Sequence, residues 1–88
     1  MRYLKKRLTI VNKEKNRERM AVVINRYVKK MAEKGWVPRL GVSSGNSFFY
    51  WEAYVWMCKP NNAEKQEAIK TAIEQRWEYD ENTGNFTW

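Results

Sequence analysis

Apolar residues recur along the N-terminal part of the chain with two different periods. Residues 3–11 alternate between apolar and polar positions, which predicts a strand. Its apolar face is formed by Leu4, Leu8 and Ile10. After Asn12 the apolar spacing changes to three and four residues, which predicts an amphipathic helix over roughly 14–34. Gly35 follows as a natural helix stop, because glycine adopts the left-handed cap conformation without strain.

Two further strands are predicted in the middle of the chain. Residues 36–43 form the first, and Pro38 favours an edge position because proline cannot donate a hydrogen bond to a neighbouring strand. The SSGNS stretch at 43–47 is predicted to be the turn. Residues 48–58, FFYWEAYVWMC, have the strongest strand pattern in the sequence.

A second helix is predicted over about 62–76. Asn61 is a favourable N-cap, and Glu64 three residues later nearly completes a capping box. The side chains expected to face inward are Ala68, Ile69, Ala72 and Ile73. These positions give the helix one apolar stripe, as expected of a helix packed on a core.

The last twelve residues, WEYDENTGNFTW, alternate aromatic and polar side chains on either side of a turn-forming centre, which predicts a β-hairpin. Pairing Tyr79 with Phe86 and Trp77 with Trp88 places all their rings on one face. The loop ENTG ends at Gly84, which can take a positive φ.

This stretch resembles the C-terminal hairpin of the immunoglobulin-binding domain of protein G, which has the same Trp-x-Tyr-Asp…Phe-Thr spacing. In that fold the aromatic ladder packs beneath a helix, so the resemblance implies that these rings belong to the core. It implies hairpin geometry and no antibody binding. The run MAEKGWV, residues 31–37, resembles the helix–Gly–Trp–strand joint of short bacterial domains of unknown function, which implies only the local turn. Neither resemblance extends over the whole chain.

The predicted order is strand, helix, strand, strand, helix and C-terminal hairpin, within a single domain of residues 1–88. This order predicts an α+β fold with an antiparallel sheet and two helices on one face, arranged in the ferredoxin-like βαββαβ order. Such a sheet leaves its second face open to water.

Composition narrows the classes of function. The chain has no histidine and a single cysteine, Cys58, so the usual zinc sites and the Cys–His or Ser–His catalytic pairs are excluded. The glycines are isolated, and no phosphate-cradling loop is predicted. We therefore expect a protein that is not an enzyme and that holds no metal or cofactor. Cys58 is expected to be a buried structural thiol, and the lack of a secretory or membrane-spanning apolar segment predicts a cytoplasmic protein.

The formal net charge of +7 is unevenly distributed. Residues 1–40 hold 13 Lys or Arg and 3 Glu, a net +10, whereas residues 41–88 hold 4 Lys or Arg and 7 Asp or Glu, a net −3. Such asymmetry attracts polyanions, which include nucleic acid, an anionic membrane and an acidic protein. Ordinary solubility charge explains the excess equally well.

Two surfaces are candidates for binding a polyanion. In 48–58 the even positions include Glu52, which marks their face as solvent-exposed, and the first strand adds cations on the same side. This aromatic face is expected to contain Tyr3, Lys5, Arg7, Tyr50, Tyr54 and Trp56. Rings interleaved with cations suit single-stranded nucleic acid, because bases stack on the rings and the cations follow the phosphates. RNA-recognition motifs use the same layout, although this chain lacks their glycine–aromatic signature.

The second candidate is a basic stripe on the first helix, on the side opposite Ile24. It contains Lys15, Arg19, Arg26, Lys29 and Lys30, of which we expect Arg19, Arg26 and Lys30 to neutralise phosphates. An ordinary solvated helix face is the alternative for this stripe. For the aromatic face, the alternatives are that the C-terminal hairpin covers it, or that a second copy covers it in a homodimer.

The sequence therefore favours a small, non-enzymatic nucleic-acid-binding protein that recognises backbone and bases with low sequence specificity, on single strands or on duplex. The alternative is a phage- or plasmid-type accessory protein that binds and modulates a host protein through an acidic surface of that partner. Aromatic and Arg-rich patches also anchor protein interfaces. Membrane adsorption is disfavoured, because the apolar face of the first helix is needed for the core.

Overall fold

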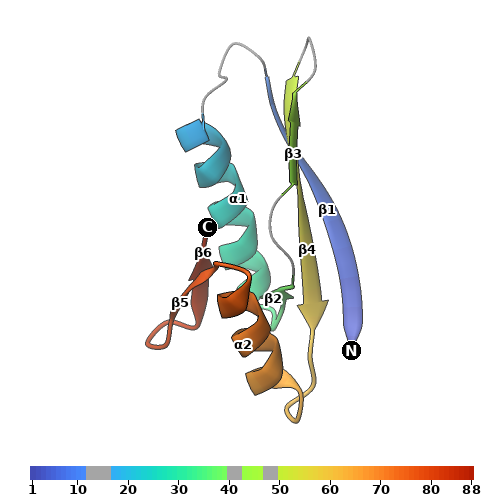
Figure 1. Ribbon diagram of the computed structural model, residues 1–88, viewed down its shortest axis with the longest axis vertical. Coiled ribbons are helices and arrows are strands. Elements are labelled where there is room, and N and C mark those ends of the chain that lie inside the picture. The colour runs from blue at the N-terminus through green and yellow to red at the C-terminus, as the bar shows by residue number, and fades with distance from the viewer. Residues whose placement is uncertain (12–16, 40–42, 47–49) are drawn as a thin grey trace.

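The computed structural model describes residues 1–11, 17–39, 43–46 and 50–88 (Figure 1). Its elements in chain order are β1 (Arg2–Val11), α1 (Arg17–Ala32), β2 (Val37–Pro38), β3 (Ser43–Asn46), β4 (Tyr50–Lys59), α2 (Lys65–Glu74), β5 (Glu78–Asp80) and β6 (Asn85–Thr87). The α+β class, with two helices and antiparallel sheets, is confirmed.

Some predicted features fall outside the described residues. They are the helix start after Asn12, residues 40–42 of the second predicted strand, and the positions of Ser47, Phe48 and Phe49. The predictions made for these residues stay predictions.

Strand β4 is the centre of the main sheet (Figure 1). β1 runs antiparallel to it along its whole length, from Arg2 opposite Lys59 to Val11 opposite Tyr50. β2 and β3 both pair antiparallel with the other edge of β4. The long β1–β4 pair agrees with the alternating pattern of both segments, because a slip of one residue would move the apolar positions of one strand to the opposite face.

The SSGN segment is a strand, so the turn predicted there is wrong for Ser43–Asn46. These residues form β3, with Ser43 opposite Tyr54 and Asn46 opposite Trp51. Serine, glycine and asparagine have low strand propensity, but propensity is weak beside the context that a sheet provides. The long edge of β4 offers backbone hydrogen bonds that override it.

Pro38 lies in the edge strand β2, as predicted. The N–H of Arg39, the next residue, donates to the carbonyl oxygen of Trp56 at 2.8 Å. Because hydrogen-bonded positions alternate along an antiparallel pair, Pro38 opposite Met57 occupies a position where β4 requires no donor. The missing N–H of proline therefore costs this sheet no hydrogen bond.

The core lies between α1 and one face of the main sheet. Val28 in the centre of α1 is fully buried, as are Ala53, Val55 and Met57, three alternate positions of β4. The half-buried Leu4 of β1 packs against the same cluster. The three- and four-residue spacing of α1 and the alternation of β4 therefore both contribute to one core.

Gly35 ends α1, as predicted. Its φ of 90° lies in the left-handed region, which glycine enters without a steric penalty. The N–H of Gly35 donates to the carbonyl of Ala32 at 3.0 Å, and that of Trp36 donates to the carbonyl of Met31 at 3.1 Å. These bonds satisfy carbonyls at the helix end and direct Trp36 into the core.

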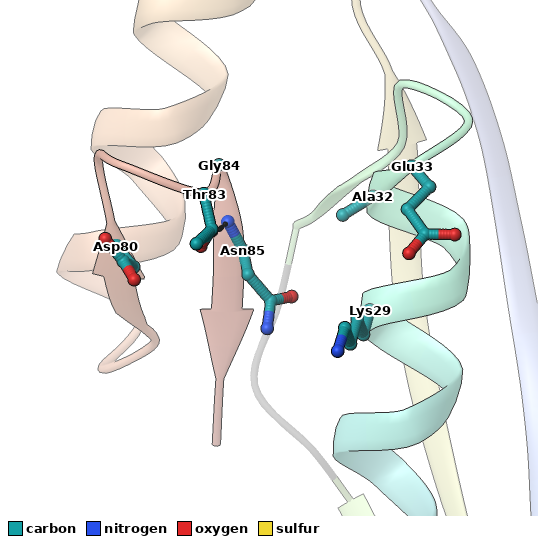
Figure 2. Close-up of a pocket in the computed structure, with 7 residues that line it drawn as sticks. All are labelled: Lys29, Ala32, Glu33, Asp80, Thr83, Gly84 and Asn85. Carbon is teal, nitrogen blue, oxygen red and sulfur yellow. Dashed lines mark hydrogen bonds between the residues drawn. The ribbon is translucent and has the colours of Figure 1, made fainter.

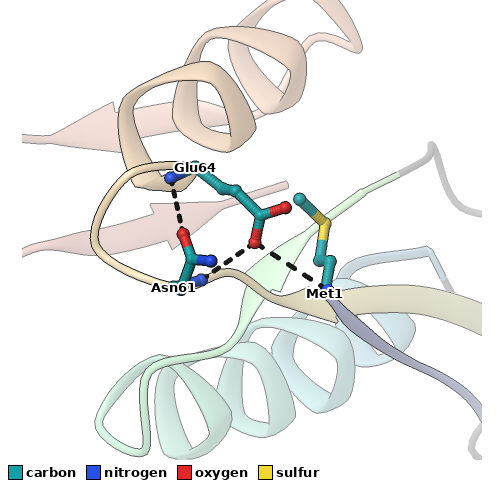
Figure 3. Close-up of polar contacts among 3 residues, drawn as sticks. All are labelled: Met1, Asn61 and Glu64. Carbon is teal, nitrogen blue, oxygen red and sulfur yellow. Dashed lines mark hydrogen bonds and ion pairs between the residues drawn. The ribbon is translucent and has the colours of Figure 1, made fainter.

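Asn61 and Glu64 form the predicted capping box ahead of α2 (Figure 3). The N–H of Glu64 donates to Oδ1 of Asn61 at 2.9 Å, and the N–H of Asn61 donates to Oε1 of Glu64 at 3.2 Å. The amino group of Met1 lies 3.8 Å from the same Oε1, so Glu64 also connects the start of β1 to the start of α2. The regular helix begins one residue later, at Lys65.

The inward face predicted for α2 is correct at three positions and wrong at one. Ala68, Ile69 and Ala72 are buried, whereas Ile73 is 51% exposed. α2 packs mainly against β2 and β5, so its buried stripe is narrow. Ile73 lies about 100° further around the helix than Ala72, which turns its side chain away from these strands.

The C-terminal hairpin forms with the predicted pairing. Tyr79 lies opposite Phe86, with ring centroids 4.7 Å apart, and the rings of Trp77 and Trp88 are 4.9 Å apart. Trp77 and Phe86 are buried and Tyr79 is half-buried, which confirms a core position for these rings, whereas Trp88 is 42% exposed and the core prediction is wrong for it. The hairpin packs against α1, where Oδ1 of Asn25 accepts from the N–H of Trp88 at 2.7 Å. In Figure 1 the helices lie between the hairpin and strands β1 and β4.

Within the described residues, β5 and β6 pair with each other and not with the main sheet. The ferredoxin-like order with both helices on one face stays a prediction. Neither described helix is both long enough and apolar enough to cross a membrane.

Candidate nucleic-acid interface

The β1–β4 register brings cations of β1 beside rings of β4. Lys5 lies opposite Trp56, and Arg7 lies opposite Tyr54. The side chains of Tyr3, Lys5 and Arg7 are exposed, and those of Tyr54 and Trp56 are partly exposed. Tyr54 and Trp56 alternate with the buried Ala53, Val55 and Met57, and the register places Lys5 and Arg7 on the same side, so these side chains share the sheet face that points away from α1.

The ammonium group of Lys5 lies over two aromatic rings. Its Nζ is 4.4 Å from the ring centroid of Tyr54 and 5.5 Å from that of Trp56. The two rings are 6.3 Å apart and tilted by 38°. Both distances are within the range of cation–π attraction, so Lys5 covers part of the ring surface that a base would use.

Arg7 is paired with an acidic residue on the same face. Its Nε lies 2.6 Å from Oε2 of Glu52, the residue predicted to mark the face as exposed. Both side chains are partly open to water, so the pair contributes at most about 1 kcal/mol to stability. Arg7 can therefore exchange Glu52 for another anion at small cost.

Arg39 completes the aromatic face and was not predicted from the sequence. Its guanidinium carbon lies 4.5 Å from the ring centroid of Tyr3, which is 58% exposed. A shallow depression of about 230 Å³ lies beside this pair. Its lining is Tyr3, Leu4, Lys5, Arg39, Trp56 and Met57. The sequence placed Arg39 in a strand, but its position near Tyr3 depends on the order and register of β1, β4 and β2, which no local pattern encodes.

Tyr50, another residue predicted for the aromatic face, begins β4. Its backbone lies opposite Val11 at the far end of the sheet. The side chain of Tyr50 lies outside the described part of the structure.

The basic stripe of α1 forms a second surface, separate from the aromatic face. Arg19, Arg26 and Lys30 are exposed, while Ile24 and Val28 on the opposite side of α1 are buried in the core. The core layer therefore lies between the stripe and the aromatic face. Of the other stripe residues, Lys29 is exposed and Lys15 lies outside the described residues.

A polar depression of about 370 Å³ lies between α1 and the hairpin (Figure 2). Lys29 and Glu33 of α1 face Thr83 and Asn85 of the hairpin across it. Oδ1 of Asn85 is buried without a hydrogen-bond partner. The charges around the depression have both signs, since Asp80 also lines it, so they select neither cations nor anions.

The described residues offer little chemistry besides these surfaces. Cys58 is buried, and this burial raises the pKa of its thiol, which favours the unreactive protonated form. Among the described residues, no group of three or more Cys, Asp or Glu could hold a metal ion.

Comparison of the chain with protein-family models, with curated proteins and with solved structures found no match. Function is therefore inferred from the residues, contacts and charges of this chain.

Proposed function

We propose that the protein is a small non-enzymatic nucleic-acid-binding protein that takes up single strands on the aromatic face with low sequence specificity. The observation that carries the proposal is the position of Lys5 over the rings of Tyr54 and Trp56. Aromatic platforms beside cations are what a single strand requires, because every base has a π-face and every nucleotide has a phosphate.

In the proposed mechanism the cations leave the rings when a strand binds. Bases stack on Tyr54 and Trp56, and each stacked base contributes about 1–3 kcal/mol. The ammonium of Lys5 turns from the rings to a phosphate, and Arg39 leaves Tyr3 in the same way. The stem of each cation is long enough to stay beside its ring while its charged end moves.

The basic stripe of α1 adds to this binding without reading sequence. Arg19, Arg26 and Lys30 face water on another side of the molecule, where they raise the positive field and meet phosphates of a longer strand or a duplex. We include in the proposal the ferredoxin-like order with both helices on one face. Residues of α2 share a depression with Tyr3 and Arg39 at one end of the aromatic face, so the stacking surface is its other part, where Tyr54 and Trp56 are partly exposed.

The test is a fluorescence titration of the tryptophans with a short mixed-sequence single strand at low and high salt. We expect quenching that weakens steeply as salt rises, because phosphate contacts release counterions. Lys5→Gln should weaken binding more than Lys70→Gln, a control that removes the same charge from an exposed position of α2. Equal effects of the two substitutions, or binding that does not depend on salt, would contradict the proposal.

An absence of binding at low salt would favour the alternative, in which the aromatic face anchors a protein partner or a second copy of the chain. Sedimentation would then show a dimer, or nuclease-treated extracts would yield one stoichiometric partner.

A further inference from the structure

The outer edge of β1 is the longest unpaired strand edge among the described residues. β1 has ten residues, and β4 pairs with all of them along one edge only. The strands that could have joined the other edge, β5 and β6, pair with each other instead. A long strand edge with unused backbone groups is a template for a further strand.

The hydrogen-bond alternation identifies the backbone groups at this edge. The carbonyl of Trp56 accepts a hydrogen bond from the N–H of Arg39, so the backbone groups of Trp56 face β2. Because these groups alternate along a strand, the even-numbered residues of β4 hydrogen-bond on the β2 side and the odd-numbered residues hydrogen-bond to β1. In the regular β1–β4 register, the odd positions of β4 lie opposite the even positions of β1. The backbone N–H and C=O groups of Tyr3, Lys5 and Thr9 therefore face the outer edge.

The charge of β1 decides what kind of strand can pair there. β1 contains Arg2, Lys5, Lys6 and Arg7, and it contains no acidic residue. Pairing of two basic stretches would place cations opposite cations, which destabilises a strand pair. Lys6 is exposed although it lies on the same face of β1 as Leu4 and Leu8, so it adds one more cation that a second copy of β1 would have to oppose.

We propose that the outer edge of β1 binds an extended acidic segment of a partner protein, which adds to the sheet as one more strand. Residues of the added strand alternate between the two faces. Acidic side chains at every second position would lie beside Lys5 on the aromatic face. Apolar side chains between them would lie beside the half-buried Leu4 and Leu8 on the core side. This β-addition goes beyond nucleic-acid binding and does not depend on it.

The test uses a peptide of alternating glutamate and valine, with N-methyl groups on its outer edge to prevent self-association. The control peptide has the same composition, with the glutamates and valines in separate blocks. We expect the alternating peptide to slow amide hydrogen exchange at Lys5 and Thr9. Exchange at Leu4 and Leu8 should change little, because their amides already bond to β4. Equal protection by the block peptide would overturn the proposal.

Thr9→Pro removes one outward N–H without touching the bonds to β4, and Thr9→Val retains it. We expect Thr9→Pro to weaken peptide binding about tenfold, as the loss of one hydrogen bond implies, and Thr9→Val to leave it unchanged. Equal binding by the two variants would contradict the proposal. Protection that rises with protein concentration without peptide would assign the edge to a second copy.

The two proposals can fail separately. Tyr54→Ala should weaken single-strand binding and leave peptide binding intact, whereas Thr9→Pro should do the reverse. If nucleic acid protects the amides of Lys5 and Thr9 and the alternating peptide does not, the edge belongs to the nucleic-acid site and the β-addition proposal is wrong.

Discussion

Substitution of Phe86 tests whether the aromatic side chains of the C-terminal hairpin stabilise the fold. Its side chain is 2% exposed, and its ring packs against Tyr79 at 4.7 Å in a hairpin that lies on α1. Truncation to alanine removes a buried ring and leaves a cavity, which costs about 3–5 kcal/mol in protein cores. We therefore expect Phe86→Ala to lower the free energy of unfolding by about this amount.

This loss is large compared with the total. At about 0.05–0.15 kcal/mol per residue, a chain of 88 residues has a free energy of unfolding of roughly 4–13 kcal/mol. Urea unfolding followed by circular dichroism has a slope of about 1–3 kcal/mol per molar for small proteins. The midpoint should fall by at least about 1 M, or Phe86→Ala should be unfolded without urea.

Trp88 provides the matched control, because it belongs to the same ladder but is 42% exposed. Trp88→Ala should cost about half as much as Phe86→Ala, since less of its ring is removed from water. A loss below about 1 kcal/mol for Phe86→Ala, or a larger loss for Trp88→Ala, would refute the reasoning. The ladder would then be a surface feature and a candidate for binding.

Three further predictions concern local features. Gly35→Ala should lower the free energy of unfolding by about 1 kcal/mol, seen as a drop in Tm of roughly 4–8 °C, because φ there is 90°. Ile69→Asp should unfold the protein, whereas Ile73→Asp should leave its circular dichroism spectrum unchanged, since only the first side chain is buried. Burial raises the pKa of Cys58 and of Tyr27 above 9.0 and 10.0, so the unfolded chain loses these protons first and stability should fall as pH rises from about 9. Urea titrations at increasing pH should show a smaller decline in the free energy of unfolding for the double variant Cys58→Ala/Tyr27→Phe than for the unsubstituted protein.

The features predicted correctly from the sequence depend on residues that are close together in the chain. The helix stop at Gly35 requires only one residue that tolerates a positive φ. The capping box requires Asn61 and Glu64 at one spacing. The hairpin pairing of Tyr79 with Phe86 follows from the loop length and the aromatic alternation.

The features that were missed depend on neighbours distant in the sequence. SSGN is a strand because the edge of β4 is available to it, which its own composition opposes. Ile73 is exposed because α2 meets only a narrow contact surface. Arg39 reaches Tyr3 only once the order of β1, β4 and β2 is known. Local periodicity contains none of this information.

The cations that lie over the rings of the aromatic face distinguish the proposed function from a purely structural role. The core contains the buried rings of Trp77 and Phe86, whereas on the aromatic face the ammonium of Lys5 lies over Tyr54 and the guanidinium of Arg39 lies over Tyr3. A cation over an exposed ring contributes about 0.5–1 kcal/mol, less than the burial of an aromatic side chain against apolar atoms. A stacked base contributes about 1–3 kcal/mol, and the displaced cation then gains a phosphate. We therefore expect the exchange of a cation for a nucleotide to be favourable on this face, because the ring gains a stacked base and the displaced cation gains a phosphate.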